Sequence, residues 1–139
     1  MKVIRRVHSQ YVLRFEYGEE FPAALEAFLK SQKILGSFFY GLGALIDPEI
    51  FHYSLKTKKY LRKKFKGEYE VAGLTGNSAI MGKKIITHCH VVLGEKDYRA
   101  RAGHLVRGKV AGTLEMHLTA LPRLRRRRDT TIGLNFLHA

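Results

Sequence analysis

The chain has 139 residues, of which 45% are hydrophobic and 27% are charged, a composition typical of one globular domain with a buried core. Its 25 lysines and arginines exceed the 12 acidic residues and give a formal net charge of +13, which favours polyanions such as DNA, or anionic substrates. No apolar stretch reaches the roughly 18 residues that a membrane span requires, so no membrane association is expected.

Residues 3–15 are predicted to form the first strand, because apolar and polar residues alternate there. The same residues lack the apolar block and the cleavage site of a secretory signal peptide. The single cysteine, Cys89, excludes an internal disulfide and fits a reducing compartment. Together these features predict a cytoplasmic protein.

A helix is predicted over residues 20–33. Its apolar side chains recur at helical spacing and form one stripe, made of Phe21, Leu25, Phe28 and Leu29. Pro22 suits the first turn of this helix, and Glu19 and Glu20 suit its positive end. Gly36 is its expected stop.

The rest of the chain is predicted to form strands, because apolar residues recur at every second position and turn residues separate the runs. The predicted strands span residues 36–44, 47–55, 59–66, 68–77, 84–94, 98–106, 109–121 and 131–137. Connections this short require mostly antiparallel pairing. One helix and about seven strands make a single α+β domain over residues 1–139, with the helix packed on one sheet face. Because a single helix cannot cover such a sheet, we expect another subunit to bury some of its apolar surface.

The glycine-rich stretch from Gly36 to Leu45 does not match a nucleotide-binding motif. A phosphate-binding loop requires Lys and Ser or Thr after its second glycine, and a dinucleotide fingerprint requires a glycine where Ile46 stands. We expect these glycines to permit a bulge or a close backbone approach instead.

Three histidines in residues 84–108 are the strongest indication of a functional site. His88 and His90 lie two residues apart in an alternating run and therefore point to the same face of a strand. A short turn leads into the next run, which carries His104. If the two runs pair, the three imidazoles converge, and three neutral imidazoles with a water molecule are the ligands of an open zinc site. The alternative is that they are ordinary strand residues, since their spacing fits no zinc finger.

Two clusters of basic residues are candidates for binding nucleic acid. The segment KTKKYLRKKFK (56–66) offers lysines suited to phosphate contacts, and RLRRRR (123–128) offers arginines of the kind that insert into narrow minor grooves. A strand is predicted after the second cluster, so this arm is not a free tail. The alternatives are a charged edge strand that resists aggregation and a solvated loop. The predicted nucleic-acid-binding residues are Lys58, Lys59, Arg62, Lys63, Lys64, Arg123, Arg125, Arg126, Arg127 and Arg128.

Glu70 and Glu115 interrupt apolar runs, and a carboxylate in a half-buried strand requires a partner. Each is therefore a candidate general base, or a residue that orients a metal-bound histidine, and each could instead be a structural ion-pair partner. Cys89 lies between two of the histidines, so its side chain is expected on the other side of the sheet, as a small core residue. No Ser-His-Asp or Cys-His catalytic signature is visible.

Four stretches, in this order, resemble the plant- and prokaryote-conserved domain family and together span nearly the whole chain. They are YGEEF with the predicted helix and GSFFYGLGAL; GEYEVAGLTGN, similar to G-x-F-E-I-L-S-L-S-G-N; THCHVVLGEKDYRARAGHLVRGKV, similar to H-x-H-V-x-L and then G-G-H-L-x-x-G-x-V; and RRRDTTIGLNFL, similar to R-x-Y-D-x-x-T-G-L-x-L-L. The chain departs from the pattern at Ala102, at Gly73 and at Arg127 or Arg128. None of these departures removes a candidate ligand.

The resemblance implies an antiparallel sheet with one helix, assembled as a homotrimer, and a DNA-binding label. In the plant proteins an AT-hook contacts the DNA while this domain serves assembly and protein partners, and this chain has no AT-hook. Many prokaryotic members carry the three histidines. The resemblance therefore also implies a divalent metal ion, with zinc expected, at His88, His90 and His104.

Two main hypotheses follow. The first, which we favour, is a non-enzymatic homotrimeric DNA-binding or regulatory protein that contacts phosphates through its basic clusters. The second is a metal-dependent enzyme that acts on a small anionic substrate through a metal-bound water molecule. A trimeric interaction module with a purely structural metal is the remaining alternative.

Overall fold

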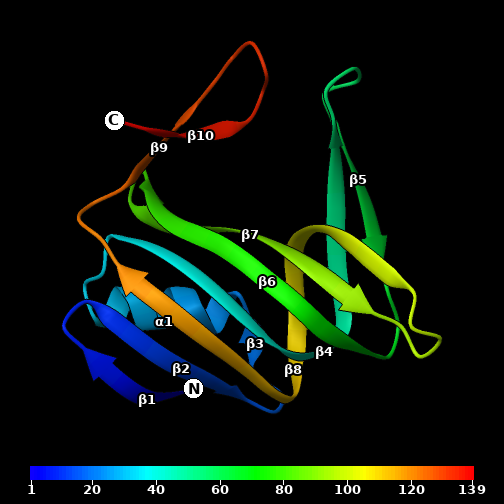
Figure 1. Cartoon of the computed structure of the whole chain (residues 1–139). Helices are drawn as coiled ribbons and strands as arrows, with labels where there is room; N and C mark the ends of the chain where they lie inside the picture. Colours follow the sequence, from blue (N-terminus) through cyan, green and yellow to red (C-terminus); the bar gives the residue numbers. More distant parts are fainter.

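The computed structural model describes residues 1–139 and contains one sheet of ten strands and a single helix (Figure 1). In chain order the elements are β1 (Lys2–Val7), β2 (Gln10–Glu16), β3 (Glu20–Phe21), α1 (Ala23–Ser31), β4 (Gly36–Ser54), β5 (Lys59–Lys64), β6 (Glu68–Met81), β7 (Lys84–Gly94), β8 (Ala100–Ala120), β9 (Arg125–Arg128) and β10 (Asn135–His138). The predicted α+β class is confirmed, and all strand pairs are antiparallel except β6 with β9. No helix is long enough to cross a membrane.

The N-terminal segment is a hairpin, and the prediction of one strand over residues 3–15 is wrong. β1 pairs antiparallel with β2, and Val7 lies opposite Gln10. His8 has a positive φ of 52° in the tight turn between them. The turn escaped prediction because neither glycine nor proline marks it and both arms keep the same alternating pattern.

The helix α1 is shorter than the predicted span of residues 20–33. The start of that span is β3, which pairs with β8, so the helix begins at Ala23, after Pro22. Glu19 lies outside the helix and contacts the N-terminal ammonium group. Gly36 does not end the helix but begins β4. The predicted apolar stripe is correct, because its members in α1 are buried, namely Leu25, Phe28 and Leu29.

Two long strands, β4 and β8, replace four shorter predicted strands. Residues 36–44 and 47–55 merge into β4, and residues 98–106 and 109–121 merge into β8. The pairing of β4 with β8 becomes irregular between Ile46 and Glu49, where Asp47 has a φ of 49°. A bulge of this kind lets a strand continue past a proline, here Pro48, that a regular ladder would exclude.

Gly41 and Gly43 permit a close approach of β4 to β8, as the sequence predicted. A Cβ atom at Gly43 would lie 2.2 Å from the carbonyl oxygen of Thr113, and one at Gly41 would lie 2.4 Å from that of Glu115. The register of β4 against β6 also shifts between these two glycines. Both the predicted bulge and the predicted close approach are therefore present.

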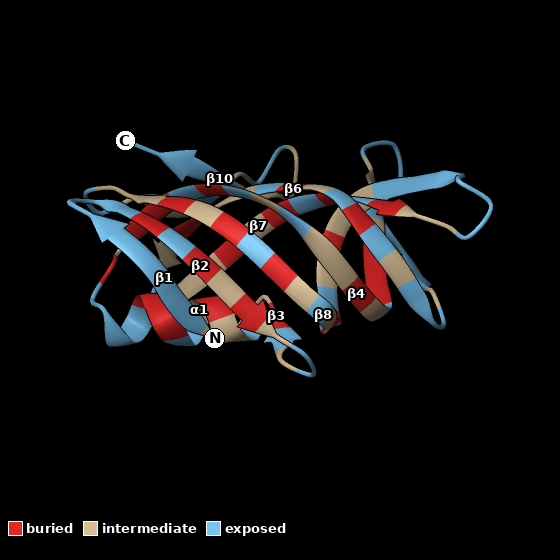
Figure 2. Cartoon of the chain, turned by 60° about the horizontal axis from the view of Figure 1, so that its bottom comes forward, coloured by how far each residue is buried: buried red, intermediate tan, exposed pale blue.

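The pairings of β4, β6, β7 and β8 close into a ring. β4 pairs with both β6 and β8, and β7 pairs with β6 and, from His90 to Gly94, with β8. Figure 2 shows α1 against one face of the sheet, and its buried residues join those of the strands in one core. Cys89 belongs to this core and is 1% exposed, as predicted.

The outer face of the sheet keeps large apolar side chains in contact with solvent. The exposed residues on β2, β4 and β7 include Val12, Phe38, Tyr40, Leu42 and Val92. Tyr40 pairs with Thr75, and Thr75 pairs with His90, so these three side chains point to the same side. The exposed apolar surface therefore extends across the strands to the histidines of β7.

β9 and β10 form a hairpin in which Arg128 lies opposite Asn135. A strand was predicted over residues 131–137, but β10 begins only at Asn135. The strand β9 was not predicted, because four consecutive arginines show no alternation of apolar and polar residues. β9 joins the sheet beside β6, where Arg125 pairs with Ile80. The basic arm is thus an ordered hairpin.

Candidate metal centre

His88, His90 and His104 converge on the outer face of the sheet. β7 carries His88 and His90, and His104 lies directly opposite His90 in β8. One ring nitrogen from each histidine lies within 4.8 Å of the others. His90 is exposed, and the other two are half-buried. The convergence expected from the H-x-H alternation and the turn after β7 is therefore present in the structure.

The spacing of the ring nitrogens fits a tetrahedral metal ion. The Nε2 atoms of His88 and His90 are 3.3 Å apart. Two nitrogens bound to zinc at the usual length of about 2.0–2.1 Å, at the tetrahedral angle, are separated by about 3.3 Å. No carboxylate or cysteine belongs to this group of possible ligands, so a metal ion here would have three imidazole ligands and one position open to water or another ligand.

Aromatic packing fixes the ring of His104. Phe51 of β4, which pairs with His104, stacks on it with ring centroids 4.1 Å apart and an interplanar angle of 18°. Tyr60 of β5 packs edge-on against Phe51 at 4.5 Å. His104 also stacks on His88, with centroids 4.9 Å apart. These contacts hold an imidazole that no hydrogen bond to a carboxylate orients.

The surroundings keep two of the imidazoles neutral. Burial, which has the largest effect, together with the neighbouring rings of His88 and His90 and the charge of Arg126, lowers the pKa of His104 from 6.5 to about 4. Burial also lowers the pKa of His88, with contributions from Arg126 and His90. Neutral imidazole is the form that binds a metal ion, so these two rings are ready to do so near pH 7.

Arg126 of β9 lies at the edge of the histidine cluster. Its guanidinium group donates hydrogen bonds to the backbone oxygen of Asn135, at 2.8 Å, and to Oδ1 of Asn77. Asn77 lies on β6 directly opposite His88. Sequence analysis predicted Arg126 as a phosphate contact on a basic arm, but the structure turns it inward, away from the exposed arginines on either side.

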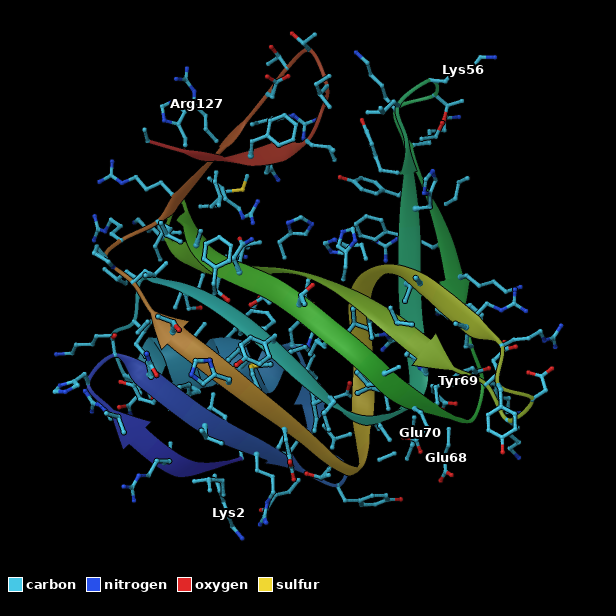
Figure 3. The ribbon with its side chains drawn as sticks, in the orientation of Figure 1. Lys2, Lys56, Glu68, Tyr69, Glu70 and Arg127 are labelled. Atoms are coloured by element: carbon cyan, nitrogen blue, oxygen red, sulfur yellow. The ribbon has the colours of Figure 1, made fainter.

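The basic clusters lie on two hairpins, β4–β5 and β9–β10, that extend at the same end of the molecule (Figure 1). Figure 3 labels Lys56 at the tip of the first hairpin and Arg127 on the second. The hydroxyl of Tyr53, on β4, donates a hydrogen bond of 2.7 Å to the carbonyl oxygen of Ile132, in the turn of the second hairpin. The two clusters, which are far apart in the sequence, therefore form one basic end, with a hydrogen bond between its two parts.

Most of the residues predicted to contact phosphates form no ion pair within the chain, but Arg62 does. Its guanidinium pairs with Glu49 at 3.1 Å. Apart from Arg62 and Arg126, the predicted residues are exposed and form no ion pair, namely Lys58, Lys59, Lys63, Lys64, Arg123, Arg125, Arg127 and Arg128.

Glu49 is a buried charge that sequence analysis missed. It is 5% exposed and accepts hydrogen bonds from Arg62, at 3.1 Å, and from Arg107, at 3.2 Å. Burial opposes its charge, but the hydrogen bonds from the two arginines, with the nearby charge of Lys64, outweigh burial and lower the pKa of the carboxyl group. A carboxylate just after Pro48 resembles an ordinary turn residue, so no local signal distinguished it.

Glu70 and Glu115 are exposed, and the expectation that they lie half-buried is wrong. Glu70 pairs with Gly94 at the far end of β7, and Figure 3 shows it at the opposite end of the molecule from Arg127. Glu115 lies on the outer face of the sheet, roughly 15 Å from the histidines by strand spacing. Both glutamates occupy outward positions between inward apolar neighbours, which explains why they seemed to interrupt apolar runs.

The fold and the cluster define a class of protein: a small, mostly antiparallel β domain with one helix and a three-histidine group on its outer face. Residues 4–122 match the Plants and Prokaryotes Conserved (PCC) domain, and the chain belongs to this family. The resemblance found in the sequence is thereby confirmed.

Solved structures resemble the chain over nearly its full length. A candidate DNA-binding protein from Bacteroides thetaiotaomicron has 30% identity and a TM-score of 0.91, with 96% of this chain and 94% of that one covered. A plant- and prokaryote-conserved protein from Pyrococcus horikoshii has 28% identity and a TM-score of 0.84, with 91% and 90% covered. A metal-containing protein from Archaeoglobus fulgidus has 27% identity and a TM-score of 0.88, with both chains fully covered. No curated protein matches the chain.

Proposed function

We propose that the protein is a DNA-binding protein that contacts phosphates through the two basic hairpins. The observation that carries this proposal is that both hairpins extend at the same end of the molecule (Figure 1). A hydrogen bond from the hydroxyl of Tyr53 to the carbonyl oxygen of Ile132 joins them. Apart from Arg62, which pairs with Glu49, their exposed lysines and arginines form no ion pairs within the chain and are free to replace counterions on a polyanion. The similar protein from Bacteroides thetaiotaomicron, a candidate DNA-binding protein, supports the same conclusion. A cytoplasmic location, expected from the lone cysteine, is part of the proposal.

The test is the salt dependence of DNA binding, measured by fluorescence anisotropy with a labelled duplex. Each phosphate contact steepens the plot of log K against log salt by about 0.9. The double variant Lys59→Gln/Lys63→Gln should flatten that slope by roughly two. Lys30→Gln/Lys33→Gln, which changes the charge by the same amount on and just after α1, should leave it unchanged. Binding that is insensitive to salt, or an equal effect of both variants, contradicts the proposal.

We also propose that His88, His90 and His104 hold a divalent metal ion, with zinc expected. The nitrogen spacing, the neutral imidazoles and the similarity to a metal-containing protein support this site. When bound, the ion would supply a Lewis acid with one open position. Elemental analysis of untagged protein should find near-stoichiometric metal, and the metal should be lost in His88→Ala and retained in His52→Ala, which changes an exposed histidine of β4.

A metal-dependent reaction on a small anionic substrate is the second candidate function. The observation that favours it is a pocket of about 280 Å³ beside the cluster, lined by Phe38, Phe39, Thr75, Gly76, Asn77, His88 and His90. If the ion is instead structural, a fourth protein ligand has to come from another subunit. Treatment with a chelator distinguishes the two. If the protein stays folded when the metal is removed but loses its activity, the result supports the enzyme over the interaction module.

We further propose a homotrimer that buries the outer sheet face. The support is the row of exposed apolar side chains around Tyr40, which is 61% exposed, and Leu42, which is 59% exposed. Apolar side chains this open on a sheet favour contact with another subunit.

A further inference from the structure

Arg126 is the only predicted phosphate contact in the basic arm that points away from solvent. Arg125 and Arg127, its neighbours in β9, are exposed, while Arg126 is half-buried. Residues in a strand alternate between its two faces, and of the four arginines in β9 only Arg126 is partly covered by the sheet. The position of Arg126 therefore differs from that of an arginine whose only role is to attract DNA.

The hydrogen bonds of Arg126 leave part of its guanidinium unused. The group has five N–H donors, of which one is bonded to the backbone oxygen of Asn135 and another to Oδ1 of Asn77. Its Nε atom is buried without a hydrogen-bond partner, and so is Oδ1 of Asn135 beside it. A buried donor on a cation is costly to leave unpaired, so the guanidinium group has hydrogen-bonding capacity that its contacts within the chain do not use.

The charge of Arg126 is also next to the histidine cluster and not balanced by any acid. Arg126 forms no ion pair, and no carboxylate belongs to the group of possible metal ligands. Arg126 is held at the cluster through Asn77, which accepts its hydrogen bond and lies directly opposite His88. With a divalent ion on three neutral imidazoles, the local positive charge would be three, which an anion would relieve.

We infer that the structure forms an oxyanion subsite in which one oxygen of the ligand occupies the open metal position and another accepts hydrogen bonds from Arg126. This inference rests on the proposed metal site and names the ligand class for it. Asn77, which accepts a hydrogen bond from the guanidinium group, lines the pocket of about 280 Å³ together with His88 and His90, and this pocket has room for a small ligand such as a phosphate or a carboxylate. Planar guanidinium groups suit such oxygens because they donate two parallel hydrogen bonds.

The experiment uses the full chain loaded with Co²⁺, whose visible spectrum reports changes in coordination. Inorganic phosphate, acetate and dimethyl phosphate are titrated separately, because they represent a phosphate monoester, a carboxylate and the diester of a DNA backbone. We expect at least one of them to change the spectrum saturably. Arg126→Gln should weaken that binding by roughly 10- to 100-fold, the range for a charge-assisted hydrogen bond. Arg5→Gln, which removes the same charge from an exposed position of β1, should change it by less than about twofold.

Two controls separate this subsite from the features around it. Tyr53→Phe loosens the C-terminal hairpin by removing its hydrogen bond to Ile132 and should leave anion binding intact. A loss of anion binding in Tyr53→Phe would assign the effect of Arg126→Gln to a change in the position of the hairpin.

Cobalt content is measured for each variant. If the wild-type chain binds no cobalt, the proposed metal site and the subsite both fail. If cobalt binds but no anion does, or if Arg126→Gln binds the anion as tightly as the wild type, only the subsite is overturned. Saturable binding of dimethyl phosphate alone would assign the subsite to nucleic acid, and binding of the other two anions would assign it to a small ligand.

Discussion

Phe51 stacks on His104, with their ring centroids 4.1 Å apart and an interplanar angle of 18°. The two residues face each other across the pairing of β4 with β8. A metal-ligating histidine that has no carboxylate partner depends on such packing for the orientation of its ring.

Replacing Phe51 with leucine should therefore weaken metal binding without removing a ligand. An aromatic pair is worth about 0.5–1.5 kcal/mol beyond its buried area, which corresponds to roughly a 2- to 12-fold loss of affinity. Competition with a chromophoric chelator measures this change. Phe136→Leu, on the exposed side of β10, is the control, and an equal effect of both variants would mean that Phe51 does not orient His104.

The metal-free protein should lose stability as the pH falls from about 6.5 towards 4. His104 has a pKa of about 4 in the folded chain and 6.5 as its ordinary value, so the unfolded chain binds more protons in this interval. His88 contributes in the same direction, because its pKa is also lowered. Urea unfolding at several pH values in the presence of a chelator measures the slope. His104→Gln should flatten it and His52→Gln should not, and a wild-type stability that is constant over this range would contradict the prediction.

Cys89 should be inert in the folded protein. Burial raises the pKa of its thiol to about 12, so the thiol stays protonated at pH 8. The residue is also only 1% exposed, so a reagent cannot reach the sulfur. A thiol-reactive chromogenic disulfide should report no free thiol in native protein and one per chain in denaturant. Rapid reaction under native conditions would mean that β7 separates from the core on the time scale of the assay.

Replacing Glu49 with glutamine should lower the free energy of unfolding by about 1.5–3 kcal/mol, the value of hydrogen bonds to a charged group. The glutamine keeps the shape but removes the charge that Arg62 and Arg107 share. Chemical denaturation measures the loss, with Glu68→Gln as the control at an exposed position. A difference between the two variants of less than 0.5 kcal/mol would show that the ion pairs are too solvated to matter.

Tyr40→Glu should convert a trimer to monomers if the outer sheet face is the subunit interface, since it places a charge in the middle of the apolar row. Light scattering after size-exclusion chromatography gives the mass directly. Leu55→Glu, at an equally exposed apolar position in the β4–β5 turn, should leave the mass unchanged. A monomeric wild-type chain would disprove the assembly.

Much of the histidine cluster could be predicted because it depends on local rules. Alternation along a strand puts His88 and His90 on one face and Cys89 on the other, and a short turn brings His104 opposite them. The place of Arg126 could not be predicted, because it depends on the route of the chain from β8 to the edge of β6, which no local pattern specifies. Glu49 was missed for the same reason, since its partner Arg107 is 58 residues away.

The long strand β8 has a consequence for how the chain is made. β2, β3, β4 and β7 all pair with it, and β2 reaches the sheet only through β8. During translation the first hundred residues therefore leave the ribosome without the strand that joins them. Until residues 100–120 emerge, β2 and β4 expose unpaired edges, and an interrupted or truncated chain would present those edges to other nascent chains.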